Sequence, residues 1–473
     1  MTNKKINNKT PVRHIKNIVF SFVATIGSLI AIAQTNGASD FHSWAPTPPM
    51  GWNSWDCYGP NVTEAEVKAN ADYMATNLKP YGWEYIVVDI RWYVANDKSH
   101  GYNETDPQYN IDSFGRFQPA VNRFPSSADG KGFKPLADYL HSKGLKLGIH
   151  IMRGVPVVAV KNKLPIKASN ATAADIYSDS MQCPWLHDMY TIDANKNGAQ
   201  AYYNSIVNMY AQWGVDFIKC DDLSRPYHKA EIEMLRKAID NCGRKILLSM
   251  SPGETPIAEG EHAMNHANMW RTIDDFWDNW PELKAHFDIF KRWNQYRTIG
   301  AYPDGDMLPL GHLGIKAERG EDRQSLFTED EQRTVMTLWA MFKSPMMFGG
   351  DLPTSNSFSI SLLKNKEILN ILQNSTNNRE LFRRDSVIAR AADDKRTGDV
   401  YIAFFNATDA AQHTSLDINS KEYQLPKRWK ALNVWTNERM AWNGEGNKKP
   451  VSKIEISNIP PHGVILYKFI KSK

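Results

Sequence analysis

A short unit recurs between residues 60 and 250 and constrains the fold more than any other feature of the sequence. In each copy a helical stretch ends at a glycine, and a β-rich run follows that finishes on polar residues. The four clearest copies are YGWEYIVVD (81–89), KGLKLGIHI (143–151), WGVDFIKCD (213–221) and CGRKILLSM (242–250). A left-handed backbone is needed where each helix ends, and each copy has a glycine there: Gly82, Gly144, Gly214 and Gly243. Several runs are almost continuously apolar, which predicts parallel strands buried on both faces.

Strands that alternate with helices predict right-handed βαβ units in a parallel sheet. Capping boxes mark two helix starts, at Thr63-x-x-Glu66 and Thr328-x-x-Glu331. Four further strands are expected near residues 50–55, 268–272, 300–304 and 346–350. Eight strands favour a closed (β/α)₈ TIM barrel over residues 40–355. No GxGxxG turn follows an early strand, which weakens the doubly wound, dinucleotide-binding alternative.

The pattern of alternating helices and strands changes after about residue 375. Short β-type runs separated by turn residues replace the helical periodicity, as in VIARAADD, DVYIAFFNA, KALNVWTN and GVILYKFIK. This pattern predicts a C-terminal antiparallel β-sandwich over residues 375–473. We find no low-complexity linker before it and expect the sandwich to pack directly on the barrel.

The first residues resemble an export signal. Five positive charges lie within the first 16 residues, and an apolar run from Ile18 to Ala33 follows and ends in small residues. We interpret residues 1–33 as a signal peptide and expect an exported protein, periplasmic or secreted. An uncleaved membrane anchor is the alternative, but the run is short for a span. After cleavage we expect no stable membrane insertion.

The composition of the chain narrows the classes of partner and of bound group that it can have. The formal net charge is +4, and the early charges account for it, so nothing electrostatic favours a nucleic-acid partner. The four cysteines have no CxxC spacing, which disfavours a zinc or redox motif but leaves one disulfide or free buried thiols open. The 15 tryptophans suit stacking on sugar rings and core packing equally well.

The active site of such a barrel lies at the carboxyl ends of its strands. Carboxylates, cations and aromatic residues converge there from different strands: Trp55, Asp89, Arg91, His150, Arg153, Lys219, Asp221, Asp222, Arg271, Asp274, Asp275, Asp304 and Asp306. We see no His/Cys/Glu cluster with metal-ligand spacing, no GxSxG and no Cys/His pairing, which disfavours metallohydrolase and acyl-transfer chemistry. We therefore expect neither a metal nor a cofactor.

Two opposed carboxylates are what cleavage of a glycosidic bond requires. Asp221 follows Lys219 on one strand, and that cation would keep it ionised, as a nucleophile must be. Asp275 lies among aromatic residues that could desolvate it and favour its protonated form, as an acid/base group requires. From the residues alone, both could equally be helix caps.

Six ordered landmarks resemble one family. They are PPMGWNSWDCYG (48–59), VVDIRWY (87–93), GLKLGIHI (144–151), DFIKCDD (216–222), MWRTIDD (269–275) and PDGDML (303–308). They are similar to glycoside hydrolase family 27, whose C-terminal sandwich the closing PPHGVILYKF (460–469) also resembles. The resemblance implies a retaining exo-glycosidase acting on an oligo- or polysaccharide, with catalytic carboxyl groups about 5–5.5 Å apart.

The resemblance also implies a role for individual positions. It places the nucleophile at Asp221 and the acid/base at Asp275. It assigns sugar contacts to Trp55, Asp89, Trp92, Lys219, Arg271 and, with a less defined role, Asp304. His150 replaces a family tyrosine and is either a sugar ligand or a structural histidine.

The sequence departs from the family in the residues expected to read the sugar hydroxyls. Ile90 replaces the second of two adjacent aspartates that grip the 4- and 6-hydroxyls, and Ser251-Pro252-Gly253 replaces the segment whose Glu holds the 2-hydroxyl. Met152 replaces a family aspartate, and Leu223 replaces a cysteine, so the family disulfide is not expected. An insertion over residues 154–189 is expected to reshape the pocket mouth.

The substrate is therefore open to several interpretations. The usual family substrate, a terminal α-D-galactoside, is our first expectation. The loss of a buried carboxylate at Ile90 suits a sugar without the 6-hydroxymethyl group, so β-L-arabinopyranosidase is an alternative, as is an isomalto-dextranase-like activity. From other classes, a non-catalytic carbohydrate-binding protein is disfavoured by the retained aspartate pair, and an NAD-linked enzyme would depend on nicotinamide.

Overall fold

Eight parallel strands form the central sheet of the computed structural model, which describes residues 40–384, 386–420, 423, 425, 429–443 and 452–471. The strands are β1 (Met50–Asn53), β2 (Tyr85–Val88), β3 (Lys146–Met152), β7 (Phe217–Asp221), β8 (Leu247–Met250), β9 (Met269–Arg271), β10 (Tyr302–Asp304) and β13 (Met346–Phe348). All eight lie where the sequence predicts them. Their residues are almost entirely buried, as the apolar runs require.

The sheet runs in the order β10-β9-β8-β7-β3-β2-β1-β13, so the first strand of the chain pairs with the last. Leu308, four residues after the end of β10, forms a parallel bridge with Phe348 of β13, and its amide donates to the carbonyl of Met347 at 2.7 Å, so the chain that follows one edge strand pairs with the other. The predicted (β/α)₈ barrel is confirmed.

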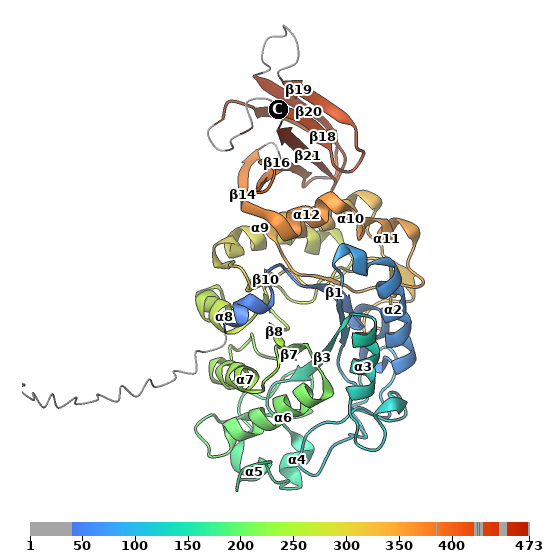
Figure 1. Ribbon diagram of the computed structural model, residues 1–473, viewed down its shortest axis with the longest axis vertical. Helices are drawn as coiled ribbons and strands as arrows, with labels where there is room; N and C mark the ends of the chain where they lie inside the picture. Colours follow the sequence, from blue (N-terminus) through green and yellow to red (C-terminus); the bar gives the residue numbers. More distant parts are fainter. Residues whose placement is uncertain are drawn as a thin grey trace, which may run out of the picture. The chain divides into compact units, whose positions relative to one another are not determined.

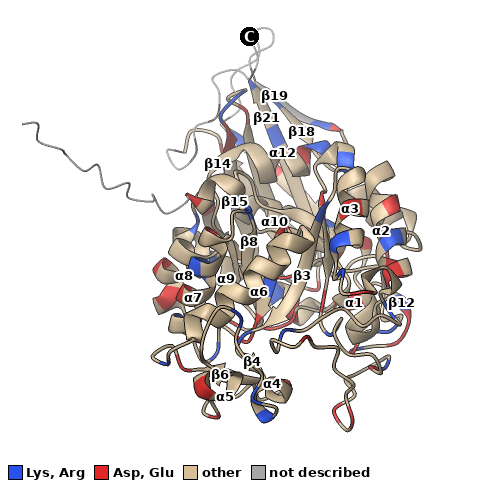
Figure 2. Ribbon diagram, turned by 60° about the horizontal axis from the view of Figure 1, so that its bottom comes forward, with Lys and Arg blue, Asp and Glu red and all other residues tan. Residues whose placement is uncertain are grey.

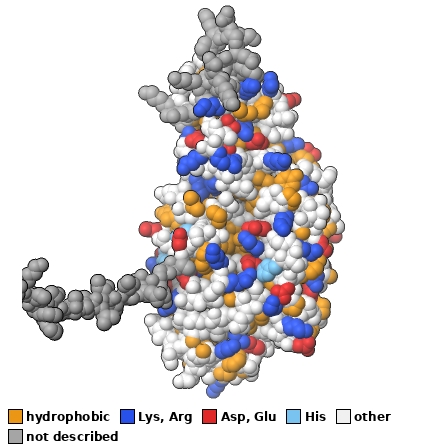
Figure 3. Space-filling model, viewed as in Figure 1, with side chains coloured by type: hydrophobic (Ala, Val, Ile, Leu, Met, Phe, Trp, Pro, Cys, Tyr) orange, Lys and Arg blue, Asp and Glu red, His pale blue; other side chains and the backbone are white. Residues whose placement is uncertain are grey.

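Helices surround the strands (Figure 1). The longer ones are α2 (Glu64–Asn77), α3 (Lys134–Ser142), α6 (Ala199–Trp213), α7 (Lys229–Asn241), α9 (Trp280–Trp293), α10 (Glu329–Phe342) and α12 (Lys366–Asn374). The shorter ones are α1 (Trp55–Tyr58), α8 (Gly260–His266) and α11 (Ser357–Leu362), with 3₁₀ turns at Phe41–Trp44, Gly59–Asn61, Lys79–Tyr81, Pro125–Ser127, Ile257–Glu259 and Asn294–Tyr296. Charges of both signs lie on the outer helices α2, α3, α7 and α8 (Figure 2), and the face in Figure 3 also mixes both signs.

The local signals read from the sequence are present. Both predicted capping boxes form, at Thr63 with Glu66 and at Thr328 with Glu331. The four glycines have φ between 68° and 95°, which is the left-handed backbone the helix-to-strand turns need: Gly82, Gly144, Gly214 and Gly243.

The predicted insertion after β3 forms a small layer of its own. Its elements are β4 (Val155–Pro156), α4 (Val157–Lys161), α5 (Ala173–Ile176), β5 (Tyr177–Ser178) and β6 (Met189–Ile192), and the strands pair in the order β4-β6-β5. A buried pair anchors it: Arg91, just after β2, donates from two nitrogens to Asp188 at 2.7 and 2.8 Å. A further two-stranded sheet consists of β11 (His312–Leu313) and β12 (Arg323–Gln324).

Two antiparallel sheets follow the barrel directly, because α12 ends at Asn374 and β14 begins at the next residue. One has the order β14-β15-β16-β21-β18-β19, from β14 (Ser375–Arg384), β15 (Val387–Asp394), β16 (Val400–Asn406), β21 (Val464–Lys471), β18 (Trp429–Asn433) and β19 (Arg439–Asn443). The other pairs β17 (Gln412–Asp417) with β20 (Lys453–Ile459). Both contribute to one apolar core that includes Phe404, Leu416 and Ile456. The predicted β-sandwich is therefore present.

The sandwich packs on the barrel, as the missing linker suggests. His462 stacks on Trp280 of α9 at 3.8 Å between ring centroids, and its Nδ1 lies 2.8 Å from a carboxylate oxygen of Glu331 in α10. The hydroxyl of Thr334 in α10 donates to the carbonyl of His462 at 2.7 Å.

The proposed signal peptide, residues 1–33, lies outside the described residues. Within the part of the chain that the structure describes, no helix is long and apolar enough to cross a membrane. All four cysteines are free thiols, which resolves the alternative that the sequence leaves open.

Candidate active site

A cavity of about 820 Å³ opens at the carboxyl ends of the barrel strands. Strand ends supply part of its lining, and loops and the first turns of α1 and α9 supply the rest. The lining comprises Trp55, Asp89, Ile90, Tyr102, Glu104, Pro184, Trp185, Lys219, Asp221, Asp222, Arg225, Pro252, Gly253, Ile273, Asp274, Asp275, Glu282, Glu318 and Arg319. The site therefore brings Asp221 and Asp275 to the same cavity, as predicted.

Asp221 is the last residue of β7 and is only 5% exposed. Its Oδ2 lies 2.9 Å from Nε2 of His150, which comes from the neighbouring strand β3 and is fully buried. Burial by itself would raise the pKa of Asp221, but the imidazole of His150, the ammonium of Lys219 and the hydroxyl of Ser251 outweigh it and lower that pKa to about 2. Asp221 is thus an ionised carboxylate facing a cavity.

Lys219 lies two residues before Asp221 and donates from Nζ to Oδ2 of Asp89 at 2.8 Å. Asn53 donates to the same oxygen at 2.7 Å, and the amide of Ile90 donates to the other oxygen at 2.8 Å. Burial would lower the pKa of Lys219, but the carboxylates of Asp89 and Asp221 raise it above its ordinary value. These hydrogen bonds hold the ammonium group of Lys219 and the carboxylate of Asp89 in place at the cavity floor.

Asp275 follows β9 and exposes a third of its side chain to the cavity. Arg271, at the end of β9, donates to one of its oxygens at 3.1 Å and pairs with Asp306 at 2.8 Å. The aromatic neighbours Trp270, Phe276 and Trp277 pack into the core and leave this part of the carboxyl group uncovered.

The positions expected to carry hydroxyl-reading acids are apolar here. Ile90 lines the cavity directly beside Asp89 and is 2% exposed, and Pro252 and Gly253 line it after β8. The nearest acid to that segment, Glu254, pairs with Arg292 at 3.0 Å and is not part of the lining. The cavity lining therefore lacks, after β2 and after β8, the carboxylates that the resemblance would place there.

Three aromatic side chains also line the cavity: Trp55, Tyr102 and Trp185. Trp55 stacks with Tyr102 at 6.0 Å between ring centroids and 25° between planes, and Tyr102 in turn lies 6.4 Å from Trp185. Flat aromatic faces suit the apolar C–H faces of sugar rings. Trp185 comes from the insertion, so the insertion does reach the cavity, as expected.

Buried arginines hold the acids around the cavity. Arg153 lies 2.8 Å from Asp222 and 2.9 Å from Glu231, and all three residues are almost fully buried. Burial and the neighbouring charge of Asp221 raise the pKa of Asp222 to about 6, although Arg153 opposes the shift. Arg91 and Arg153 are therefore ion-pair partners within the fold and are not part of the cavity lining.

Several predicted site residues lie behind the lining instead of in it. His150, Arg271 and Asp304 are at most 5% exposed and contact lining residues or their neighbours. Burial and Asp306 raise the pKa of Asp304 to about 7.

The structure corrects the sugar contact expected for Trp92. Its indole donates to the carbonyl of His150 at 2.7 Å and packs edge-on against Phe133 and Trp213, so it is a core residue and does not line the cavity.

Sequence reasoning missed the lining residues that come from loops and from the first turn of α9, namely Tyr102, Glu104, Pro184, Arg225, Glu282, Glu318 and Arg319. These positions carry no strand-end signal. Trp185 and Pro184 could have been suspected only because they lie within the insertion. The mouth of the cavity is thus far less visible in the sequence than its floor.

Comparison with known proteins identifies the family. The model described as alpha galactosidase A matches residues 47–162 and 161–374, and the model described as the alpha galactosidase C-terminal beta sandwich domain matches residues 391–469. The chain belongs to glycoside hydrolase family 27. It is accordingly a glycosidase that hydrolyses O-glycosyl bonds of a carbohydrate substrate, and its resemblance to the family in sequence is confirmed.

The relatives within the family differ in substrate. The β-L-arabinopyranosidase of family 27 from Geobacillus stearothermophilus is 46% identical, with a TM-score of 0.86 over 91% of this chain and 98% of that one. A putative α-N-acetylgalactosaminidase from Bacillus halodurans is 44% identical, with a TM-score of 0.80 over 90% and 98%. Alpha-galactosidase A from Cellvibrio japonicus is 28% identical over 93% of this chain and 96% of its own.

Proposed function

We propose that this enzyme is a retaining β-L-arabinopyranosidase, with Asp221 as the nucleophile and Asp275 as the general acid/base. The observation that carries the substrate is Ile90 in the cavity wall beside Asp89. A β-L-arabinopyranoside has the ring and hydroxyl arrangement of an α-D-galactoside without the hydroxymethyl group at C5. An apolar side chain fits a sugar that presents no polar group there, whereas a galactoside would bury its 6-hydroxyl against Ile90 without a partner.

The similarity to an enzyme with this activity supports the same substrate, at 46% identity over nearly the whole of both chains. The likeness to Cellvibrio japonicus alpha-galactosidase A favours an α-galactoside as the second candidate, at 28% identity. An α-galactoside is our first expectation from the sequence; the place of Ile90 in the cavity lining, together with the 46% identical arabinopyranosidase, favours the opposite order.

In the first step, Asp221 attacks the anomeric carbon while Asp275 gives its proton to the leaving oxygen. A covalent glycosyl-enzyme results. His150 and Lys219 keep the nucleophile ionised and fix its orientation. Arg271 holds the carboxyl group of Asp275 from below the cavity floor.

In the second step, Asp275 takes a proton from a water molecule, which attacks the same carbon and releases Asp221. Two displacements return the sugar with its original anomeric configuration. Lys219 and Asp89 remain available at the floor as hydrogen-bonding partners for the ring hydroxyls, since both line the cavity.

The test is a set of aryl glycosides: β-L-arabinopyranoside, α-D-galactoside and α-N-acetylgalactosaminide. We expect kcat/KM for the arabinopyranoside to exceed that for the galactoside by at least about tenfold. Proton NMR of the first product should show the retained anomer. A preference for the galactoside would refute the proposed substrate, and an inverted product would refute the mechanism.

The nucleophile is tested by Asp221→Asn, which we expect to lower kcat roughly 10⁴-fold. The matched control is Asp274→Asn, which removes a carboxylate beside Asp275 that is 62% exposed at the cavity mouth and pairs only with Arg225 among the described ion pairs. This control should keep most of the activity. Equal losses in the two variants would contradict the assignment of Asp221.

A further inference from the structure

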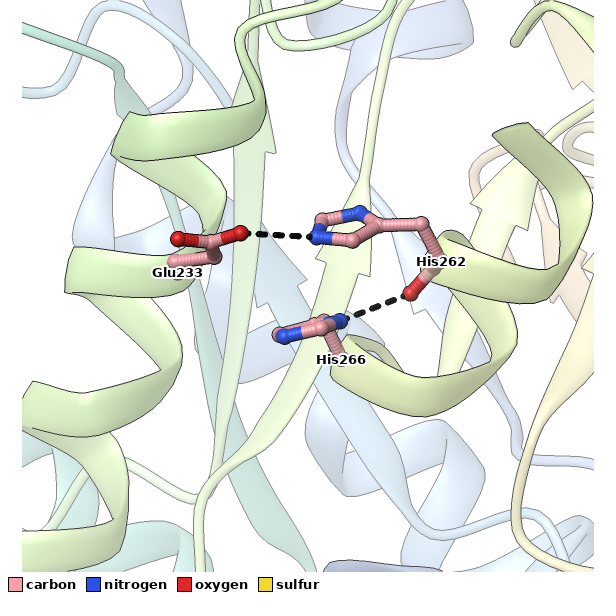
Figure 4. A group of neighbouring side chains, drawn as sticks. All are labelled: Glu233, His262 and His266. Atoms are coloured by element: carbon pink, nitrogen blue, oxygen red, sulfur yellow. Dashed lines mark hydrogen bonds and ion pairs between the residues drawn. The ribbon is translucent and has the colours of Figure 1, made fainter.

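Three potential metal ligands gather between helices α7 and α8, away from the catalytic cavity. His262 and His266 are one helical turn apart on α8, and Glu233 comes from α7 (Figure 4). One ligand atom from each lies within 4.8 Å of the others. None of the three lines the cavity, so the proposed hydrolysis does not use them.

The second nitrogen of each histidine already has a partner. Nδ1 of His266 lies 2.8 Å from the backbone carbonyl of His262, and since a carbonyl only accepts, this nitrogen carries the hydrogen. Nδ1 of His262 lies 2.7 Å from the hydroxyl of Tyr227. These contacts leave Nε2 of both rings directed toward Glu233, as Figure 4 shows. Metal-binding histidines have this arrangement, because an outer partner fixes the tautomer and the ring orientation.

The three potential ligands are close to one another. Nε2 of His262 is 3.3 Å from Oε1 of Glu233, and the two imidazole rings stack with their centroids 3.9 Å apart and 21° between their planes. Glu233 exposes 51% of its side chain, whereas His262 exposes 10% and His266 is partly buried. The site is therefore anchored on one side by two helices and open to solvent on the other.

We propose that Glu233, His262 and His266 form a binding site for a divalent transition-metal ion, with Zn²⁺ the ion that fits best. Two imidazole nitrogens and one carboxylate oxygen are a known protein ligand set for zinc, and water completes the tetrahedron. The ion would link α7, which follows the strand that carries Asp221, to α8, which follows the next strand of the barrel. It would act on the stability of this sector and not on the chemistry.

The proposed site differs from one expectation from the sequence, namely that no cluster of histidine, cysteine or glutamate has metal-ligand spacing. The pair His262-x₃-His266 has the spacing of two ligands on one helical face. The third ligand is 29 residues earlier in the sequence, on a different helix, so only the fold brings it to the pair.

The proposal is tested by titrating ZnCl₂ into the untagged full-length chain in a calorimeter. We expect one ion per chain, with binding weakened at least about tenfold in His266→Ala and in Glu233→Gln. Tyr227→Phe keeps all three ligands and removes only the outer partner of His262, and it should also weaken binding, by about tenfold or more. His413→Gln removes an exposed histidine of β17 and should leave binding unchanged.

Thermal unfolding gives a second readout that does not depend on activity. At a hundredfold excess over its Kd, Zn²⁺ should raise Tm by about 3 °C in the wild type and by much less in His266→Ala. Retained glycoside hydrolysis shows that the variants are folded. The proposal is overturned if no saturable binding occurs below about 100 μM Zn²⁺, a weak affinity even for partial sites, or if His266→Ala binds as well as His413→Gln.

Discussion

Replacing Ile90 by aspartate should convert the specificity of this enzyme toward α-galactosides. Ile90 is 2% exposed, lines the cavity and directly follows Asp89, whose carboxylate already has Lys219 and Asn53 as partners. A second carboxylate at this position would accept hydrogen bonds from the 6-hydroxyl that a galactoside carries and an arabinopyranoside lacks. Lys219 would partly balance the added negative charge.

The size of the effect follows from two opposite changes. A hydrogen bond from the galactoside to the new carboxylate is worth about 1.5–3 kcal/mol. When the arabinopyranoside is bound, the same carboxylate stays desolvated without a partner, which costs about 1–3 kcal/mol. Together they predict that the ratio of kcat/KM for the two substrates changes by roughly 10²- to 10⁴-fold in favour of the galactoside.

The assay compares kcat/KM for aryl α-D-galactoside and aryl β-L-arabinopyranoside on the same enzyme preparation, so that the ratio does not depend on the active fraction. Ile90→Val is the matched control, because it changes the size of the side chain without adding charge, and its ratio should stay within about tenfold of the wild type. If Ile90→Asp leaves the ratio of the two kcat/KM values unchanged, or if Ile90→Val shifts it equally, then Ile90 does not discriminate between substrates by their C5 substituent.

Three further substitutions test other parts of the site. Arg153→Met leaves the buried carboxylates of Asp222 and Glu231 without their cation, and we expect a loss of about 3–5 kcal/mol, measured as a fall in Tm of about 4 °C by calorimetry. Asp304→Asn removes a carboxyl group whose pKa burial and a neighbouring acid raise to about 7. Because the unfolded chain releases this proton near pH 4, the wild type loses stability between about pH 4 and pH 7, so the Tm of the variant relative to wild type should rise across that window. Asp275→Ala should keep kcat/KM for dinitrophenyl glycosides, whose leaving group needs no proton, and lose about 10²- to 10⁴-fold in kcat/KM on substrates with poor leaving groups, whereas kcat should fall for both because the second step loses its base.

Each of these three predictions has a control or a result that would contradict it. Arg225→Met removes one member of an exposed pair with Asp274, so it should change the free energy of unfolding by no more than about 1 kcal/mol. A loss as large as that of Arg153→Met would mean that burial does not set the cost. A Tm difference that is flat with pH would contradict the role of the Asp304 carboxyl group. A uniform loss of kcat/KM across all leaving groups would contradict the acid role of Asp275.

The barrel was predictable because its signals are local. A glycine with positive φ, an apolar run and a capping box each depend on a few neighbouring residues, and eight such runs were enough to recognise the architecture. In the sandwich, the apolar strands were found and the polar or irregular ones were not. β14 has the sequence STNNRELFRR, and only its pairing with β15 makes it a strand.

The candidate site was predictable only in part. A position at a strand end shows how far along the barrel axis a residue lies, but not whether its side chain points into the cavity or outward. Trp92 lies near a strand end like Trp55, but its indole points outward to the helix layer, toward Phe133 and Trp213. His150 also lies on a strand, yet it is hidden beneath Asp221. The positions of the loop residues at the cavity mouth, such as Tyr102, depend on long-range packing, which the periodicity of the sequence does not predict.

The pairing of the first barrel strand with the last has a consequence for synthesis. The indole of Trp52 in β1 donates to the carbonyl of Gly350, 298 residues later in the chain. At about 5–20 residues per second, a ribosome needs roughly 15–60 s to make that distance. During that time the outer edge of β1 has no strand to pair with, and an open parallel edge is a template for another chain. The segment Met346–Phe348 is therefore the closing piece of this barrel, and a nascent chain that ends before it leaves the edge of β1 exposed to aggregation.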